Sequence, residues 1–222
     1  MQQEHPFIPY QQERFTKEEM LEKAEAFYQL MNQRRTVREF SDEPLPLDLI
    51  SKLIMTASTA PSGANKQPWT FCVITHAGLK KQIRQAAEKE EKRNYEERMS
   101  KRWLEDLEHL ETDWQKAFLE EAPCLVAVFK RVYEKDETGK HNNYYVNESV
   151  GLATGLFITA VHQAGLASLT YTPSPMNFLS DLLKRPDNER PYLLIPIGYP
   201  ASGASVPDQA RKPQEEVMVL YA

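Results

Sequence analysis

The sequence predicts an α+β fold, in which helices flank one β-sheet, on three grounds. Segments whose apolar residues recur at helical spacing alternate with short apolar runs rich in β-branched and aromatic residues. The composition supports a core, because 41% of the 222 residues are hydrophobic and the length suits one domain. No internal repeat and no low-complexity tract interrupts the alternation.

The expected helices follow the period of 3.6 residues. The first has a start signal, since Thr16 can cap it and Glu19 stands three residues later, as in a capping box. Met20, Phe27 and Met31 then fall on one face. We predict helices over residues 16–33, 47–58, 79–99, 144–164 and 178–184.

The expected strands are short runs of branched and aromatic residues. We predict them over residues 69–75, 125–132, 166–172 and 192–198. The only two cysteines, Cys72 and Cys124, fall inside such runs. They are typical of core thiols in a reducing compartment and not of a disulfide. We therefore expect a cytoplasmic protein, because the N-terminus also carries no apolar signal segment.

One segment, residues 88–121, differs in composition from the rest of the chain. It holds 12 acidic and 7 basic residues, a balance that favours disorder. Yet it also carries an apolar stripe at spacings of three and four, typical of a helix: Tyr95, Met99, Trp103, Leu107, Leu110, Trp114 and Phe118. We predict a helical lid there, within a single domain over 16–222 that follows an arm over 1–15 and ends in an extension over 203–222.

Several function classes are disfavoured by the sequence. The net charge is −5, which argues against binding nucleic acid through bulk charge, and no apolar run is long enough to span a membrane. Glycine is scarce, at 8 of 222 residues, and neither a G-x-G-x-x-G nor a P-loop motif occurs. No H-E-x-x-H, no G-x-S-x-G and no cysteine cluster occurs, so we expect no metal site.

One basic cluster follows the first predicted helix. Arg34, Arg35 and Arg38 stand with Thr36 within five residues, and Arg211 with Lys212 could join them from far along the chain. Guanidinium groups and a hydroxyl suit a phosphate monoester, which they can bind through charge-assisted hydrogen bonds. A solvated basic turn is the alternative for this cluster.

Longer motifs carry a family resemblance over about residues 30–221. Residues 34–38 (RRTVR), 60–64 (APSGA) and 67–69 (QPW) resemble the nitroreductase superfamily of FMN enzymes. Residues 90–91, 94–95, 102–103 and 114–116 are similar to the active-site lid of one branch, the iodotyrosine deiodinases. So are residues 170–173, 196–200 and 211–213. The lid residues are more specific than the nitroreductase motifs, which many activities share.

The resemblance implies a three-layer sandwich with a central mixed β-sheet, in an intertwined homodimer that holds FMN at the subunit interface. Arg34, Thr36 and Arg211 would bind the flavin phosphate, while Arg38 would lie near the N1/O2 edge of the ring. Ser62 would come from the other subunit. The full set of cofactor-binding residues that it implies is Arg34, Arg35, Thr36, Val37, Arg38, Ser62, Gly63, Thr170, Tyr171, Thr172 and Arg211.

The resemblance also implies reductive dehalogenation of halotyrosines, with 3-iodo-L-tyrosine giving L-tyrosine and iodide. Thr172 would be catalytic, because its hydroxyl matches the group that hydrogen-bonds flavin N5 and favours stepwise electron transfer. The Ala64 backbone N–H would bind the phenol oxygen. NAD(P)H or a separate reductase would supply electrons, although the sequence contains no recognisable nicotinamide site.

The residue types in the lid fit such a ligand. An amino-acid zwitterion needs an anion for its ammonium group and a cation for its carboxylate. Glu91 and Tyr95 stand four residues apart, so both project from one helix face, and Lys116 follows 21 residues later. Glu91 would accept from the ammonium, while Tyr95 and Lys116 would donate to the carboxylate.

Plainer interpretations of the same residues remain open. Glu91 and Lys116 could belong to a charged surface, Tyr95 could be a core residue, and Thr172 could simply end a strand. Tyr171 stands where the resemblance leads us to expect a smaller residue, so its role is open. Two other functions remain possible: a general NAD(P)H-dependent nitroreductase or quinone reductase, and a non-catalytic module that binds FMN or an amino acid.

Overall fold

A computed structural model describes residues 7–222 of the chain, and its packing divides the chain into two units, Met1–Arg34 and Arg35–Ala222. The predicted arm over 1–15, of which residues 1–6 lie outside the described part, and the single domain over 16–222 stay predictions. Across residues 7–222, none of the helices is long and apolar enough to cross a membrane.

The first unit consists of one helix, α1 (Lys17–Asn32), and its flanks. The predicted capping box is confirmed: the Glu19 backbone N–H donates to Thr16 Oγ1 at 3.2 Å, and the Thr16 N–H donates to Glu19 Oε2 at 2.8 Å. None of the residues of α1 is buried, and the side chains of Met20 and Phe27 are more than half exposed.

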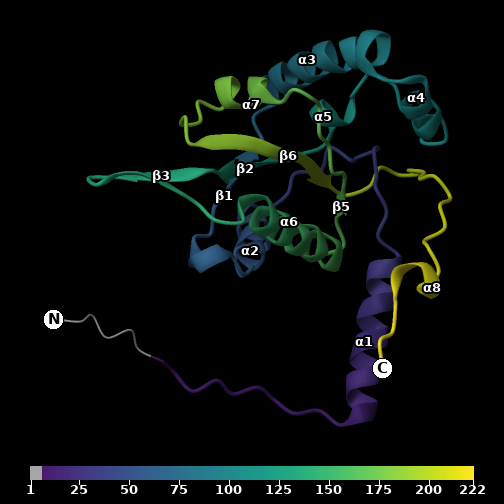
Figure 1. Ribbon diagram of the computed structural model, residues 1–222. Helices are drawn as coiled ribbons and strands as arrows, with labels where there is room; N and C mark the ends of the chain where they lie inside the picture. The colour runs from purple at the N-terminus through teal and green to yellow at the C-terminus, as the bar shows by residue number, and fades with distance from the viewer. Residues whose placement is uncertain (1–6) are drawn as a thin grey trace. The chain divides into compact units, whose positions relative to one another are not determined.

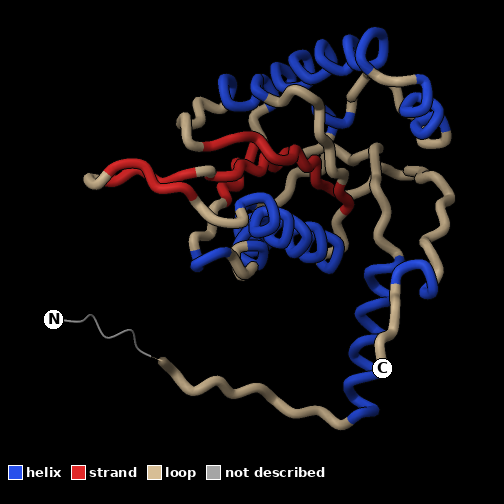
Figure 2. Tube along the Cα trace, viewed as in Figure 1, coloured by secondary structure: helices blue, strands red, loops and turns tan. Residues whose placement is uncertain are grey.

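The second unit has three layers around a four-stranded sheet of order β1-β2-β6-β5 (Figure 1). Its strands, all paired antiparallel, are β1 (Trp69–Ile74), β2 (Cys124–Arg131), β5 (Ala167–Ser168) and β6 (Glu189–Gly198). Helices α2 (Leu47–Ala57) and α6 (Val146–Gln163) cover one face. The other face carries α3 (Ala77–Arg93), α5 (Phe118–Glu121) and α7 (Asn177–Leu182). Figure 2 shows the strands as a single layer between these helices.

Strand β2 explains why both faces are apolar. Val126 and Val128 lie in the core cluster that also contains Phe157 of α6. Leu125 and Phe129, whose side chains point the opposite way, lie in a second cluster beneath α3 and α7. The predicted α+β sandwich is therefore confirmed, with a core on each side of one sheet, but the strands of this sheet pair antiparallel and do not form the mixed sheet that was expected. Cys124 is buried, Cys72 is half-buried, and both are free thiols.

The predicted strand over 166–172 is shorter than expected. Only β5 pairs regularly with β6, and the ladder resumes at an isolated bridge between Tyr171 and Leu194. Between them, the Leu169 N–H donates to the Pro196 carbonyl at 3.3 Å. Since proline has no N–H to return that bond, the ladder is interrupted at this point.

The polar hairpin of β3 (Tyr133–Asp136) and β4 (Gly139–Asn142) was not predicted from the sequence. Three of the eight strand residues in this hairpin are lysines or histidines, and no apolar alternation marks it. A short helix, α8 (Gln214–Val217), interrupts the C-terminal extension.

An extended segment, residues 36–41, runs beside the end of the sheet. Thr36 forms a parallel bridge with Ser168, and the Val37 N–H donates to the Ser168 carbonyl at 3.3 Å. Phe40 forms an antiparallel bridge with Pro200. These contacts fix the position of Arg38 at the edge of the second unit's sheet.

Candidate active site

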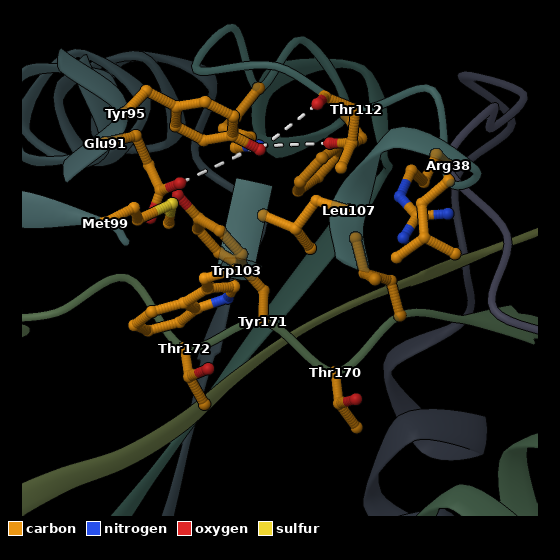
Figure 3. Close-up of a pocket in the computed structure, with 14 residues that line it drawn as sticks. Arg38, Glu91, Tyr95, Met99, Trp103, Leu107, Thr112, Thr170, Tyr171 and Thr172 are labelled. Carbon is orange, nitrogen blue, oxygen red and sulfur yellow. Dashed lines mark hydrogen bonds and ion pairs between the residues drawn. The ribbon is translucent and has the colours of Figure 1, made fainter. Parts of the chain in front are cut away.

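A cavity of about 210 Å³ lies in the second unit, between the segment that follows α3 and residues 169–172 (Figure 3). It brings together seven residues that the sequence nominated: Arg38, Glu91, Tyr95, Lys116, Thr170, Tyr171 and Thr172. We refer to residues 91–118 as the helical wall of the cavity, and to Arg38 with residues 169–172 as its sheet wall. The other lining residues are Met99, Trp103, Leu107, Leu110, Thr112, Phe118 and Leu169.

The helical wall is not one continuous helix. After α3 the chain forms a π-helical turn, η2 (Asn94–Arg98), and Met99 is extended. Ser100 then caps a new helix, α4 (Lys101–Glu108), by accepting from the Trp103 N–H at 3.2 Å. The predicted stripe is therefore divided between several elements, yet six of its seven residues line the cavity. The exception is Trp114, whose ring lies 5.4 Å from the Lys92 amine.

Glu91 and Lys116 form a buried ion pair at the centre of the helical wall. Lys116 Nζ lies 3.8 Å from Glu91 Oε2, and the two side chains are 5% and 8% exposed, respectively. The same ammonium group donates to Thr112 Oγ1 at 3.2 Å and to the Asp113 carbonyl. The backbone N–H of Lys116 donates to Glu88 Oε1 at 2.8 Å, which anchors this turn to α3.

Burial disfavours the charged form of both partners. It raises the pKa of Glu91, against the opposing charge of Lys116. It likewise lowers the pKa of Lys116, against the opposing charge of Glu91. A buried pair of this kind contributes little to stability, because desolvation offsets the attraction between the charges. Such a pair suits a site that binds a ligand carrying complementary charges.

Tyr95 completes the predicted triad. Its hydroxyl donates to the Thr112 carbonyl at 3.1 Å, and its ring lies 5.4 Å from the Lys116 amine. Burial, with the nearby charge of Glu91, raises the pKa of Tyr95, so the phenol keeps its proton as a donor. Glu91, in α3, and Tyr95, in η2, both line the cavity.

The sheet wall presents a cation and two hydroxyls. The side chains of Thr170 and Thr172 are exposed, whereas Tyr171 between them is buried. This alternation follows from the extended backbone that pairs with β6 at Tyr171. Arg38 is half-buried, and burial lowers its pKa.

The remaining predicted residues lie outside the lining of this cavity. Ser62, Gly63 and Ala64 belong to a loop with a 3₁₀ turn, η1 (Gly63–Asn65). Ala64 and Asn65 have φ values of 49° and 52°, which are strained for residues with a side chain. A Cβ atom at Gly63 would lie 3.0 Å from the Tyr144 carbonyl oxygen, a tight contact that favours glycine there.

The basic segment is divided between the units. Arg34 ends the first unit, while Arg35, Thr36 and Val37 begin the second and are half-buried. Arg211 lies in the exposed C-terminal extension. Two lining residues, Thr112 and Leu169, were not predicted as part of a site. Thr112 lies in a turn with no periodic signal, and Leu169 has the appearance of an ordinary strand residue.

Known proteins are similar to this chain in sequence and in fold. The family model described as the Nitroreductase family matches residues 31–199. An iodotyrosine deiodinase from Haliscomenobacter hydrossis is 57% identical over 222 residues, which is the whole length of both chains. The chain belongs to the nitroreductase family, in its iodotyrosine deiodinase branch. The resemblance inferred from the sequence motifs is thereby confirmed.

More distant members of the branch match over nearly the same length. Iodotyrosine deiodinase 1 of Homo sapiens is 42% identical over 214 residues, covering 96% of this chain and 74% of the relative. The crystal structure of oxidized iodotyrosine deiodinase bound to FMN and 3-iodo-L-tyrosine has a TM-score of 0.73 and 36% identity. That match covers 88% of this chain and 98% of that one. This chain is thus similar to members of the branch both in sequence and in fold.

Proposed function

We propose that the protein is an FMN-dependent reductive dehalogenase of halotyrosines, which converts 3-iodo-L-tyrosine to L-tyrosine and iodide. The observation that carries the proposal is the buried Glu91–Lys116 pair beside Tyr95, in a cavity whose other wall includes Thr170 and Thr172. Relatives bearing the name iodotyrosine deiodinase, and a solved relative bound to FMN and 3-iodo-L-tyrosine, support it.

The sheet wall fits a flavin. Arg38 offers a guanidinium group for the electron-rich edge of the ring, and Thr170 and Thr172 offer exposed hydroxyls. A second cavity of about 420 Å³ shares Arg38 and Leu110 with the first, which extends the available space toward residues 205–207. Thr36 and Arg211 would hold the phosphate end, as the resemblance implies.

When bound in its reduced form, FMN supplies the two electrons that, with a proton, replace the carbon–iodine bond by a carbon–hydrogen bond and release iodide. The protein side chains hold the amino-acid substrate for that step. Glu91 accepts from the substrate ammonium, while Lys116 and the Tyr95 hydroxyl donate to its carboxylate. The Ala64 N–H, in the loop that also carries Ser62 and Gly63, would bind the phenol oxygen, and the Thr172 hydroxyl would donate to flavin N5. Closure of the helical wall excludes water.

The protein acts as a homodimer in this proposal, because one chain leaves its cofactor residues apart. The loop that carries Ser62 and Gly63 contacts Tyr144 and Tyr145, and Tyr145 is 74% exposed. The neighbouring helices α2 and α6 also expose Met55 and Leu152. A second copy that covers this apolar face would bring its own Ser62 and Gly63 to the flavin.

Two further parts of the proposal concern the cell. NAD(P)H, directly or through a reductase, supplies the electrons, and the protein works in the cytoplasm, where its free thiols suit a reducing environment. The family resemblance supports the electron donor and the free thiols support the cytoplasm, and each is open to direct assay.

A single-turnover assay tests the proposed function. The FMN-loaded protein is reduced under anaerobic conditions and mixed with 3-iodo-L-tyrosine, while flavin absorbance and free iodide are followed together. We expect one iodide per flavin reoxidised and L-tyrosine as the product. Binding of iodotyrosine without flavin reoxidation would instead indicate a non-catalytic module.

A further inference from the structure

The hydroxyl group of Tyr171 has no part in the function proposed above, although it is buried beside Glu91. Tyr171 is 9% exposed, and its phenol oxygen has no hydrogen-bond partner among residues 7–222. A buried hydroxyl without a partner costs free energy of folding, whereas phenylalanine would fill the same space without that cost. The oxygen atom therefore needs an explanation.

The direction of this hydroxyl is fixed by the fold. The backbone N–H and carbonyl of Tyr171 both bond to Leu194 of β6, at 2.9 and 3.0 Å. The ring of Phe118 packs edge-on against the Tyr171 ring, with centroids 5.5 Å apart and planes at 86°. Figure 3 shows that the phenol of Tyr171 points toward the carboxylate of Glu91. The donor is thus presented from the sheet side, opposite the helical wall.

Glu91 needs a second donor once a ligand is bound. An ammonium group has three donors, and Lys116 already directs two of them to Thr112 and Asp113. One donor remains, and Lys116 Nζ lies 3.8 Å from Glu91 Oε2, beyond hydrogen-bond distance. If that last donor turns to the carboxylate of a bound amino acid, it is not available to Glu91.

We propose that Tyr171 is a positioning residue for substrate binding, whose hydroxyl donates to the Glu91 carboxylate while that carboxylate accepts the ammonium group of an α-amino acid. The inference rests on the proposed function and deepens it, because it explains how Glu91 stays oriented when Lys116 engages the ligand. Burial and the charge of Glu91 raise the pKa of Tyr171, which keeps the phenol protonated.

The test compares two ligands on the FMN-loaded protein by calorimetric titration. One is 3-iodo-L-tyrosine, and the other is its desamino analogue, 3-(4-hydroxy-3-iodophenyl)propionic acid, which keeps the ring and the carboxylate. We expect Tyr171→Phe to weaken binding of iodotyrosine about tenfold, the effect of one hydrogen bond to a charged group, and to leave the desamino analogue unchanged. In a Glu91→Gln background, Tyr171→Phe should have no further effect.

The matched control is Tyr192→Phe, which removes a hydroxyl from β6 that bonds only weakly, at 3.4 Å, to the Asn147 carbonyl. It should change the affinity for neither ligand. Equal weakening of both ligands by Tyr171→Phe, with a lowered melting temperature, would assign the hydroxyl a structural role and overturn the inference. Unchanged affinity would also overturn it, while the proposed function would stand. Wild-type protein that binds no iodotyrosine would overturn both.

Discussion

The two walls of the cavity are held in place by different kinds of interaction. The sheet wall is fixed by backbone hydrogen bonds: Val37 donates to Ser168, and Leu169 and Tyr171 donate to β6. In the helical wall, α4 buries none of its residues, and burial disfavours the charged forms of both Glu91 and Lys116. The two walls therefore differ in role: the rigid sheet wall would hold the flavin, and the less stable helical wall would recognise the amino acid.

The largest effect is expected from Lys116→Ala. This variant tests whether the two walls bind different ligands. Removal of the amine takes the cation from the substrate carboxylate and leaves Glu91 buried without its partner. The loss in substrate binding free energy should be about 3–5 kcal/mol. Halotyrosine turnover should therefore fall more than about 100-fold. Flavin-dependent nitro reduction, which needs only the sheet wall, should persist.

Steady-state assays with iodotyrosine and with a nitroaromatic compound measure this separation. Lys135→Ala is the control, because Lys135 is an exposed lysine that pairs with Asp187 in the hairpin region. It should leave both activities unchanged. An equal loss of both activities in Lys116→Ala would count against separate roles for the walls.

A pair of leucines tests the difference in stability between the walls. Leu125→Ala removes a fully buried side chain from β2 and should lower the free energy of unfolding by about 2–5 kcal/mol. Leu107→Ala, on the half-buried face of α4, should lower it by less than about 1 kcal/mol and weaken iodotyrosine binding roughly tenfold. Urea unfolding and ligand titration would measure both, and the reverse ranking would contradict the comparison.

Thr172 tests the chemistry assigned to the sheet wall. Thr172→Ala should reduce the rate of iodide release in a single turnover by about tenfold, because one hydrogen bond to the flavin is lost. The affinity for iodotyrosine should remain, since the helical wall is intact. Thr172→Ser, which keeps the hydroxyl, should retain the rate; if serine and alanine behave alike, the hydroxyl has no part in the reaction.

The smallest effect concerns pH. Glu91 must be ionised to accept an ammonium group, and burial raises its pKa above the ordinary value. As the pH is lowered, the affinity for iodotyrosine should therefore begin to fall at a pH above the normal titration range of glutamate. The fall is limited to about tenfold per pH unit for a single group. Glu91→Gln should not show this fall in affinity at low pH. Subtracting its pH profile from that of the wild type removes the contribution of the ligand's own titration. Identical pH profiles for the two proteins would refute the assignment.

Most of the regular elements could be predicted from the sequence, because helical spacing and apolar strand runs reflect burial. The capping box at Thr16 was predicted down to its partners. The hairpin of β3 and β4 could not be, since it is polar and only its pairing gives it structure. Strand β5 ends early because its partner position is Pro196, a pairing that the sequence alone does not reveal.

The candidate site was predictable in its members but not in its geometry. The triad of Glu91, Tyr95 and Lys116 was named from spacing and family resemblance, and all three line the cavity. No local pattern connects Lys116 with Glu91, because the turn at Thr112 that joins them is irregular. The orientation of Tyr171 toward Glu91 likewise depends on its pairing with Leu194, which is a tertiary contact.

The central claim is that the helical wall recognises the charged groups of an amino acid, and one ligand comparison tests it directly. The affinities of 3-iodo-L-tyrosine and of 2-iodophenol, which shares only the iodinated phenol ring, are measured by titration of the FMN-loaded wild type and of Glu91→Gln. We predict that the wild type prefers iodotyrosine by at least about 100-fold and that Glu91→Gln loses most of this preference without losing affinity for iodophenol. An equal preference in both proteins would contradict the account.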